Sequence, residues 1–302
     1  MPALNHKLLV YKIFRRYVLL AGLLFIFKAG CGQVRSDEYA FSQHEPLISG
    51  IHTLSIHVMD TLTHDSVYRF LKYRLSLPVY YTPERYGNRK YAGLYAGNMV
   101  LEPCGPYPEI QYSTDSFRAV FYGMNFEVKS SLQHCRRVLT GLDMPFQDNQ
   151  SSLYLRDSMI CSDNVFSALY EVGDRNKRDS LRSILSPDRL NTPGIKYISE
   201  IQIGFREVAT LQRWKELLYP RMLPGENICR VNDSLHINFI EDTIYQVKAI
   251  TFRVGSLAST VNYLEEFDLP FSVLQNKIKL EPSHVFGLTV FFSEGTDIPE
   301  YY

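Results

Sequence analysis

The chain has 302 residues, of which 45% are hydrophobic and 21% charged, so it is long enough to bury one large hydrophobic core or two ordinary ones. Its 32 basic and 32 acidic residues give a formal net charge of zero, which argues against a nucleic-acid partner because no basic surface is available to attract one. The 21 Tyr and 18 Phe residues argue against a disordered chain and favour strands and pocket walls.

The first 31 residues have the pattern of a secretory signal. Lys7, Lys12, Arg15 and Arg16 make the start basic without any acidic residue, and residues 17–27 then form an uncharged apolar run. A basic start before about 7–15 apolar residues is typical of a signal segment, whereas a transmembrane helix needs roughly 20 such residues. We therefore expect an exported protein of the cell envelope, either periplasmic or on the outer surface.

The end of this segment bears on membrane attachment. Ala29-Gly30-Cys31 resembles the end of a bacterial lipoprotein signal, and the resemblance implies that Cys31 is acylated and anchors the mature protein in a membrane. Lys28 departs from that pattern, which prefers Leu, so ordinary cleavage nearby and an uncleaved anchor stay open as alternatives. Residues 32–48 are polar and predict a tether. Four further cysteines allow three disulfide pairings, and none has the C-x-x-C spacing of a zinc or redox site.

A pattern of strand, polar break, amphipathic helix and proline occurs four times in the rest of the chain. In the first copy, Leu54, Ile56 and Val58 alternate with polar residues before the helix, and Pro78 follows it. Alternation at period two places one strand face against a helix, and proline cannot continue that helix. The four helices are expected over residues 65–75, 131–142, 208–218 and 257–267.

Further strand candidates follow each proline, for example residues 91–102 and 235–240. We therefore predict an α+β fold of four tandem βαβββ units, paired into two cupped mixed sheets with helices on the outer face. A polar stretch over residues 174–193 is the natural division of the chain. Residues 49–185 are then the first domain, with two units, and residues 194–296 are the second domain, with two weaker units.

The first unit resembles the vicinal oxygen chelate superfamily, which contains glyoxalases, extradiol dioxygenases and bleomycin resistance proteins. The resemblance rests on residues 51–60, on Leu77-Pro78, and on residues 91–106 with their Ala-Gly-Asn sequence and Glu102. It extends over roughly residues 49–296 and is strongest in the first unit. It implies that paired units form a cup, in which metal-dependent members bind a divalent cation through His or Gln on each first strand and Glu on each last strand.

Strand parity predicts which residues of the first strand face this cup. Because the alternating apolar residues must face the helix, Thr53, Ser55 and His57 are expected on the cup side. The family's usual His position then falls on Thr53, and His52 is expected on the helix side or at the strand start, without a role. His57 is a candidate general base because its ordinary pKa is near neutrality, although a hydrogen-bonded wall residue is the simpler interpretation.

The second unit repeats this arrangement. The resemblance places Gly123 at the first-strand position, with Asn125 and Glu127 further along. It matches Glu102 with the last-strand Glu of the first unit and Glu171 with that of the second. The resulting ligand-binding candidates are Thr53, Ser55, His57, Tyr95, Glu102, Asn125, Glu127 and Glu171. The metal candidates are Glu102, Glu171 and His57, which make a poor three-point site.

The third and fourth units offer a weaker site. Glu200 occupies the first-strand position of the third unit, with Gln202 beside it, and Ala249 is its partner in the fourth. The fourth unit's last strand is apolar where a Glu would lie, so a metal is not expected in the second cup.

Two functions fit these residues. The first is an exported protein that binds a small organic ligand in the first cup without a metal. The second is a metal-dependent lyase, isomerase or dioxygenase of the same superfamily, in which a divalent cation polarises the substrate. The second requires the strand register to place His52 in the cup. A structural envelope protein and a homodimer also stay open.

Overall fold

The computed structural model describes residues 46–108, 118–162, 165–171, 175–185, 192–221 and 226–295. The predicted signal segment, Cys31 and most of the predicted tether lie outside these residues. Leu47 is 4% exposed and Ile48 begins the first strand, so the last part of the predicted tether belongs to the fold. No helix among the described residues is long and apolar enough to span a membrane.

The first two units are built from strands and helices in the order expected. The first contains β1 (Ile48–Val58), α2 (Thr61–Arg69) with a π-helical final turn (Phe70–Arg74), β2 (Val79–Tyr86), β3 (Arg89–Tyr95) and β4 (Val100–Gly105). The second contains β5 (Ala119–Val128), α3 (Leu132–Gly141), β6 (Phe146–Asn149), β7 (Ser152–Leu155) and β8 (Phe166–Tyr170). The polar stretch that follows contains the helix α4 (Arg175–Ile184).

The other two units follow α4. The third contains β9 (Ile195–Phe205), α5 (Val208–Leu218), β10 (Ile228–Asn232) and β11 (Leu235–Glu241), so its described part has two strands after the helix instead of the expected three. The fourth contains β12 (Gln246–Val254), α6 (Leu257–Glu266), β13 (Phe271–Leu274), β14 (Lys277–Leu280), a 3₁₀ turn (Pro282–His284) and β15 (Val290–Ser293).

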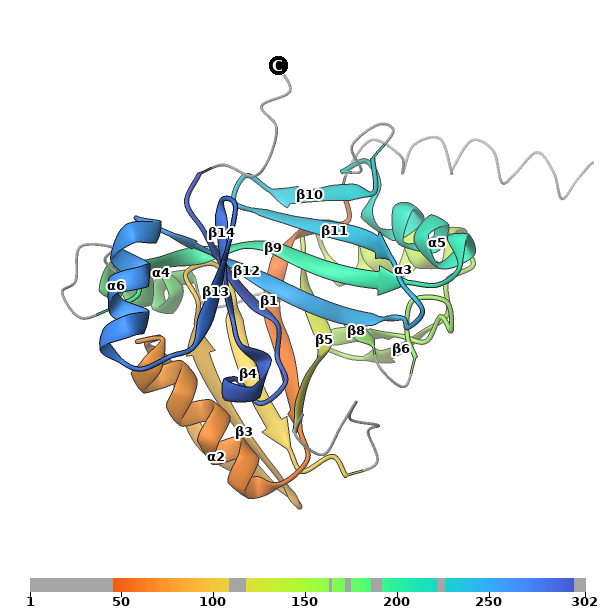
Figure 1. The fold of residues 1–302 in the computed structure, drawn as a ribbon. Helices are drawn as coiled ribbons and strands as arrows, with labels where there is room; N and C mark the ends of the chain where they lie inside the picture. Colours follow the sequence, from red (N-terminus) through yellow and green to blue (C-terminus); the bar gives the residue numbers. More distant parts are fainter. Residues whose placement is uncertain are drawn as a thin grey trace, which may run out of the picture. The chain divides into compact units, whose positions relative to one another are not determined.

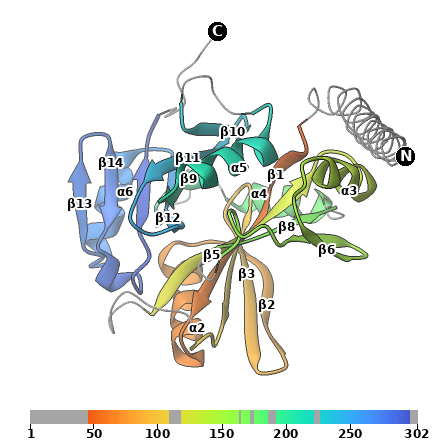
Figure 2. The ribbon, with the colours of Figure 1, turned by 90° about the vertical axis from the view of Figure 1, so that its right-hand side faces the viewer.

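These units pair into two mixed sheets (Figure 1), which confirms the predicted α+β class. The first sheet has the order β2-β3-β4-β1-β5-β8-β7-β6, and the second has the order β10-β11-β9-β12-β15-β14-β13. In each sheet the first strands of two units pair antiparallel, and each first strand pairs parallel with the last strand of its own unit. Figure 2 shows the hairpins β2–β3 and β13–β14 at the outer edges of the sheets.

Local sequence accounts for both ends of these helices. The side chains of Asp60, Ser131 and Ser256 each accept a hydrogen bond from the backbone N–H three residues further on, as N-caps do. Asp143 and Asp268 each have a φ of 51° directly after the helix, two residues before a proline. A short polar side chain tolerates this left-handed conformation, which ends the helix and turns the chain into the next strand.

Each of the four first strands contains at least one extra residue that strand parity alone did not reveal. In the β1–β5 ladder, Ile51 pairs with Phe126 but Thr53 pairs with Asn125, so His52 is an extra residue in β1. The same irregularity leaves Tyr122, Ser199 and Lys248 as extra residues in β5, β9 and β12. A β-bulge of this kind places two consecutive residues opposite a single partner and shifts the alternation by one residue.

The bulges explain why two consecutive residues of each first strand leave the core. Ile51 and Leu54 are at most 1% exposed and belong to the hydrophobic core, and the two residues between them point the other way. His52 therefore shares a face with Thr53, which corrects the expectation that it would lie on the helix side. We call this face of the first sheet, which also carries Ser55 and Glu102, the first cup face, and the face of the second sheet that carries Glu200 the second cup face.

The opposite faces of the sheets belong to one continuous core. Leu54, Ile56 and Val58 are fully buried in it together with Val67 of α2, as parity predicts. The ring of Phe126 in β5 lies 6.0 Å from the ring of Trp214 in α5, so side chains of the first sheet and of the third unit interlock. The four cysteines among the described residues are unpaired thiols.

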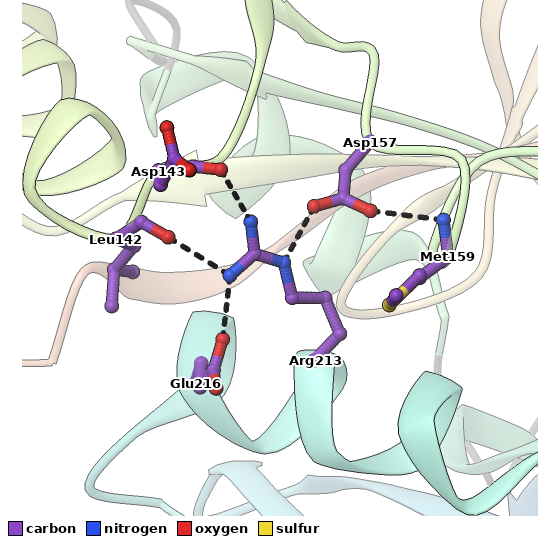
Figure 3. Close-up of polar contacts among 6 residues, drawn as sticks. All are labelled: Leu142, Asp143, Asp157, Met159, Arg213 and Glu216. Atoms are coloured by element: carbon purple, nitrogen blue, oxygen red, sulfur yellow. Dashed lines mark hydrogen bonds and ion pairs between the residues drawn. The ribbon is translucent and has the colours of Figure 1, made fainter.

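One arginine adds polar contacts between the same two parts (Figure 3). Arg213 of α5 donates hydrogen bonds to the backbone carbonyls of Leu142 and Asp143 at 2.9 and 2.6 Å. It also binds the carboxylate of Asp157 at 2.5 Å and that of Glu216 at 2.7 Å. Carbonyl groups at a helix C-terminus lack partners within the helix, so Arg213 satisfies groups at the end of α3.

Candidate functional site

Glu102 projects from β4 onto the first cup face. The ladder between β1 and β4 pairs it with Ser55, whose hydroxyl donates a hydrogen bond to Glu102 Oε2 at 3.2 Å. The hydroxyl of Tyr81, two strands away, donates a short hydrogen bond to Glu102 Oε1. Burial raises the pKa of the Glu102 carboxyl, and the bonds from Tyr81 and Ser55 oppose that shift.

Gly93 allows Tyr81 to reach Glu102. It lies opposite Tyr81 in the β2–β3 ladder, and a Cβ atom at Gly93 would approach a ring carbon of Tyr81 to 2.4 Å. Any larger residue would therefore displace the ring that bonds Glu102. Burial, followed by the Glu102 charge, raises the pKa of the Tyr81 hydroxyl well above its usual range, so Tyr81 remains a donor.

An open pocket of about 420 Å³ extends from Glu102 towards the β2–β3 edge of the sheet, within the usual size range of ligand sites. Its lining is formed by Tyr81, Glu84, Tyr86, Tyr91 and Glu102. Glu84 pairs with Tyr91 across the ladder, and Tyr86 donates a hydrogen bond to Glu84 at 3.0 Å. The rings of Tyr86 and Tyr91 meet edge to face at 5.8 Å, so the pocket combines three aromatic rings with two carboxylates.

His57 forms part of a stack of rings on the same face. It lies between Tyr107 and Tyr122, with ring centroids 3.7 Å away on both sides, and the Arg89 guanidinium lies 4.0 Å from the Tyr107 ring. Burial and then the Arg89 charge lower the pKa of His57 to about 3. The imidazole is therefore neutral at physiological pH, and His57 serves as a wall residue of the cup.

The other end of the first cup face is covered by α4. Arg178 of α4 forms an ion pair with Glu127 and contacts His52 Nδ1 at 2.5 Å, and Lys177 lies 4.4 Å from the centre of the Tyr80 ring. Burial, followed by the Arg178 charge, lowers the pKa of His52 to about 4, so this histidine is also neutral. Arg178 of α4 thus supplies a positive charge to Glu127 and a contact to His52 at this end.

The second cup face holds a closed polar cluster around Glu200, which is 2% exposed. Its carboxylate accepts hydrogen bonds from Gln202, Asn238 and Thr251 at 2.9, 3.1 and 3.0 Å. Lys277 adds an ion pair at 2.8 Å. Although burial alone would raise it, the pKa of Glu200 is lowered to about 2 by these donors, Lys277 foremost. This carboxylate is ionised, and its hydrogen-bond and ion-pair partners all come from within the protein.

The structure brings some of the predicted site residues together. Ser55 and Glu102 share a hydrogen bond, and His57 lies further along the same face. Thr53 and Asn125 are paired in the ladder between the first strands, and Thr53 is 4% exposed. These residues all belong to the first cup face.

Other predicted residues lie apart from Glu102. Tyr95 is fully buried, its hydroxyl donates to the Gly97 carbonyl at 2.7 Å, and its ring stacks on Tyr80, so it forms part of the wall below α4. Glu127 belongs to the same end because it is paired with Arg178. Glu171 accepts a hydrogen bond from the Leu132 N–H at 2.8 Å and caps α3, so the expectation that it shares the cup with Glu102 is wrong.

Of the pocket residues, the sequence pointed to Glu102 but not to Tyr81, Glu84 or Tyr86. The sequence feature that could have revealed them is the pattern of a β-hairpin. Glu84 and Tyr86 alternate at period two, Gly87 has a φ of 64° that favours a turn, and Arg89 and Tyr91 alternate in the returning strand. A hairpin paired in this register places Glu84 and Tyr91 on one face, beside Glu102.

The ladder registers identify the four positions in each cup from which the family's metal ligands would come. Because Ser55 pairs with Glu102 and Asn125 pairs with Ala168, the last-strand position of the second unit is Ala168 and not Glu171. The last-strand positions of the other units are Asn238 and Phe291. The first-strand positions are held by Thr53, Gly123, Glu200 and Ala249.

These residues do not fit a divalent cation of the family's type. The first cup has one carboxylate, Glu102, among its four positions, and alanine, glycine and threonine side chains occupy the others. In the second cup, Glu200 already binds Lys277. Among the described residues, no group of three or more His, Cys, Asp or Glu side chains is arranged to hold a metal ion. The bulge brings His52 to the cup face, but Arg178 contacts its Nδ1 atom there.

Comparisons with known proteins agree with this architecture. No family model matches the chain, and no curated protein matches it in sequence. An extradiol ring-cleaving dioxygenase from B. fuscum superimposes with a TM-score of 0.55 at 12% identity, covering 84% of this chain and 75% of that one.

Two other solved structures are similar to a comparable degree. A mutant of 4-hydroxymandelate synthase from Streptomyces coelicolor has a TM-score of 0.53 at 10% identity, covering 82% of this chain and 92% of that one. A halotolerant catechol dioxygenase has a TM-score of 0.52 at 10% identity, covering 82% and 87%. At such low identity the likeness establishes the fold alone. The chain therefore has the fold of the vicinal oxygen chelate superfamily, as its first unit suggested.

Proposed function

We propose that this protein binds a small organic ligand in the pocket of the first cup. It does so without a metal ion at the positions from which metal-dependent proteins of this fold bind one. The observation that carries the proposal is the open pocket of about 420 Å³ beside Glu102. A concave site lined by aromatic rings and a few convergent polar groups is the usual form of a small-molecule site.

The contrast between the two cups supports the first as the site. The carboxylate of Glu200 is closed off by Lys277 and three neutral donors, and its residue is 2% exposed. Glu102 is half-buried, receives two neutral donors, and borders open space. A ligand group can therefore reach Glu102, whereas Glu200 is already satisfied.

The alternative function is a metal-dependent lyase, isomerase or dioxygenase. Two of the similar solved structures are described as dioxygenases, which favours this candidate at the level of fold. The residues at the family's ligand positions argue against it because Gly123 and Ala168 have no donor atoms in their side chains. We therefore rank it second.

One experiment separates these two functions. The protein is screened against a library of neutral and charged organic fragments by ligand-observed NMR, with and without a chelator, and its metal content is measured. We expect binding that persists in chelator, is lost in Glu102→Ala and is retained in Glu171→Ala, the matched carboxylate outside the pocket. About one equivalent of bound metal that is lost in Glu102→Ala would instead support the metal-dependent enzyme.

We also propose that the protein is exported to the cell envelope and attached to a membrane. The support is the basic and apolar start of the chain and Ala29-Gly30-Cys31. In a bacterial host, Cys31→Ser is expected to abolish incorporation of a labelled fatty acid. Incorporation that is unchanged in Cys31→Ser, or absent in the unmodified chain, would replace the lipid anchor by cleavage or an uncleaved segment. Sedimentation of the purified protein tests the homodimer that the sequence left open.

A further inference from the structure

We propose that the ligand of this pocket is an organic cation, an amine or quaternary ammonium group on a small apolar skeleton. This inference rests on the proposed function and specifies its ligand. Two observations support it. The pocket is lined by tyrosines and glutamates, and other carboxylates of the cup faces form ion pairs with basic residues of the protein, whereas Glu102 is bonded by hydroxyl groups.

The composition of the pocket matches a cation in both shape and charge. All five lining residues are tyrosines or glutamates. The faces of aromatic rings attract cations, most strongly where water is partly excluded, and several rings around one space form a cage for ammonium groups. Glu84 and Glu102 add negative charge to the same space, so a cation gains there where an anion would be repelled.

The other carboxylates of the cup faces show how this protein balances buried charge. Glu127 forms an ion pair with Arg178, and Glu200 forms one with Lys277. Glu102 is different, because the described partners of its carboxylate are the hydroxyls of Tyr81 and Ser55, which carry no charge. A partly buried carboxylate gains most from a positive partner, and the pocket leaves room for a ligand to supply one.

The basic residues near the pocket are directed elsewhere. Arg89 lies on the same face as Tyr86, but its guanidinium lies against the ring of Tyr107, beside His57, and it does not line the pocket. Lys90, the next residue, forms an ion pair with Asp65 of α2 at 2.5 Å. In the part of the chain that the structure describes, the pocket between Glu84 and Glu102 is therefore lined without a basic side chain.

The pocket has an exposed rim and a more buried inner end. Tyr86 is 65% exposed at the rim, and the Glu84 side chain that it bonds is exposed as well. Glu102 and Tyr81 form the deeper part, where the hydroxyl groups orient the carboxylate. A ligand can therefore place its charged group towards Glu102 and rest its skeleton against the rings of Tyr86 and Tyr91 at the rim.

Three probes of nearly equal shape test this inference on the full chain purified in detergent. They are choline, its neutral isostere 3,3-dimethylbutan-1-ol, and the anion 3,3-dimethylbutanoate. Titrations followed by NMR or calorimetry are expected to show choline binding at least about tenfold more tightly than either other probe, because only choline gains the ring and carboxylate attraction. Its affinity should fall as salt is raised, since part of the attraction is electrostatic.

Variants locate the binding. Glu84→Gln and Tyr86→Leu change exposed side chains, and each is expected to weaken choline binding between about threefold and tenfold. Glu265→Gln, an exposed carboxylate of α6 outside the pocket, should leave it unchanged. Equal binding of all three probes, absence of choline binding at millimolar concentration, or equal effects of Glu84→Gln and Glu265→Gln overturns the cation inference. The proposed function falls separately, if the fragment screen finds no ligand that depends on Glu102.

Discussion

The ammonium group of Lys277 lies 2.8 Å from the carboxylate of Glu200, so the second cup carries its own cation. The Glu200 side chain is 3% exposed and that of Lys277 is 24% exposed. In Lys277→Met, the buried carboxylate loses the positive charge that is paired with it. We expect a loss of about 2 kcal/mol in unfolding free energy, less than the roughly 3–5 of a fully buried pair because Lys277 is partly solvated.

Urea denaturation measures this loss, and Glu200→Gln with Lys277→Met in one chain is the control. Because both charges are then absent, the double variant should be more stable than the sum of the single effects predicts. Strictly additive effects would contradict the ion pair.

The Glu200 carboxylate should also make stability depend on pH. Its pKa is about 2 in the folded protein against 4.5 ordinarily. A group whose pKa is depressed by folding contributes stability above its unfolded pKa and loses it as the pH falls towards the folded pKa. We therefore expect the contribution to be complete above about pH 4.5 and to disappear between pH 4.5 and 2. Thermal unfolding between pH 6 and 3 should show a smaller decline for Glu200→Gln.

Burial of His57 predicts a separate loss of stability on acidification, which begins at a higher pH than the loss from Glu200. Its pKa is about 3 in the folded protein against 6.5 ordinarily, because burial between Tyr107 and Tyr122 disfavours the charged ring. The unfolded chain then binds the proton more readily, so stability should fall as the pH drops from 6.5 towards 3. His57→Phe preserves the stacking and should reduce this decline. An imidazole that titrates near pH 6.5 in NMR spectra would refute the prediction.

Arg213 should contribute strongly to stability because its guanidinium satisfies groups from two units (Figure 3). It bonds the Leu142 and Asp143 carbonyls and the Asp157 carboxylate, and Asp157 is 5% exposed. We expect Arg213→Met to lower the unfolding free energy by about 2–4 kcal/mol. Arg206→Met, at an exposed position just before α5, serves as the control and should change stability little. Equal effects of the two substitutions would argue against these contacts.

Glu171 should affect the helix and leave the pocket unchanged. Its carboxylate accepts the Leu132 N–H at the start of α3, where negative charge also favours the helix dipole. We expect Glu171→Ala to reduce the unfolding free energy by about 1 kcal/mol, in the range for lost N-caps. Fragment binding at Glu102 should stay within twofold of the unmodified protein. Loss of that binding in a folded variant would restore Glu171 as a site residue.

Local sequence patterns predicted much of the scaffold. The alternating residues of the first strand indicated its buried face correctly, as Leu54 and Ile56 show, because apolar side chains at period two must share one side of a sheet. The amphipathic pattern predicted α3 and α5 closely, since a helix of that period buries one stripe. Glu102 lies beside Ser55 of the first strand, as expected, because the last strand of the unit pairs with its first strand.

Parity failed where the strands have bulges. An inserted residue such as His52 leaves the composition of a strand unchanged but reverses the alternation on one side of it. Sequence alone does not show which partner residue is skipped, because the skip is a property of the ladder between β1 and β5. The prediction for Glu171 was wrong for a related reason. Glu171 follows β8 directly, and only the pairing of β5 with β8 reveals that Ala168 holds the position equivalent to Glu102.

The sequence by itself determined the repeated pattern of strand and helix and the apolar residues that a first strand buries, because these depend on neighbours within a few residues. The tertiary structure decided which carboxylates receive an internal cation: Arg178 of α4 reaches Glu127, Lys277 reaches Glu200, and Glu102 borders the pocket. Those partners are brought together from distant segments by sheet pairing and by the path of α4. Long-range contacts of this kind leave no periodic pattern in the chain, so the chemistry of the pocket could be read only from the folded protein.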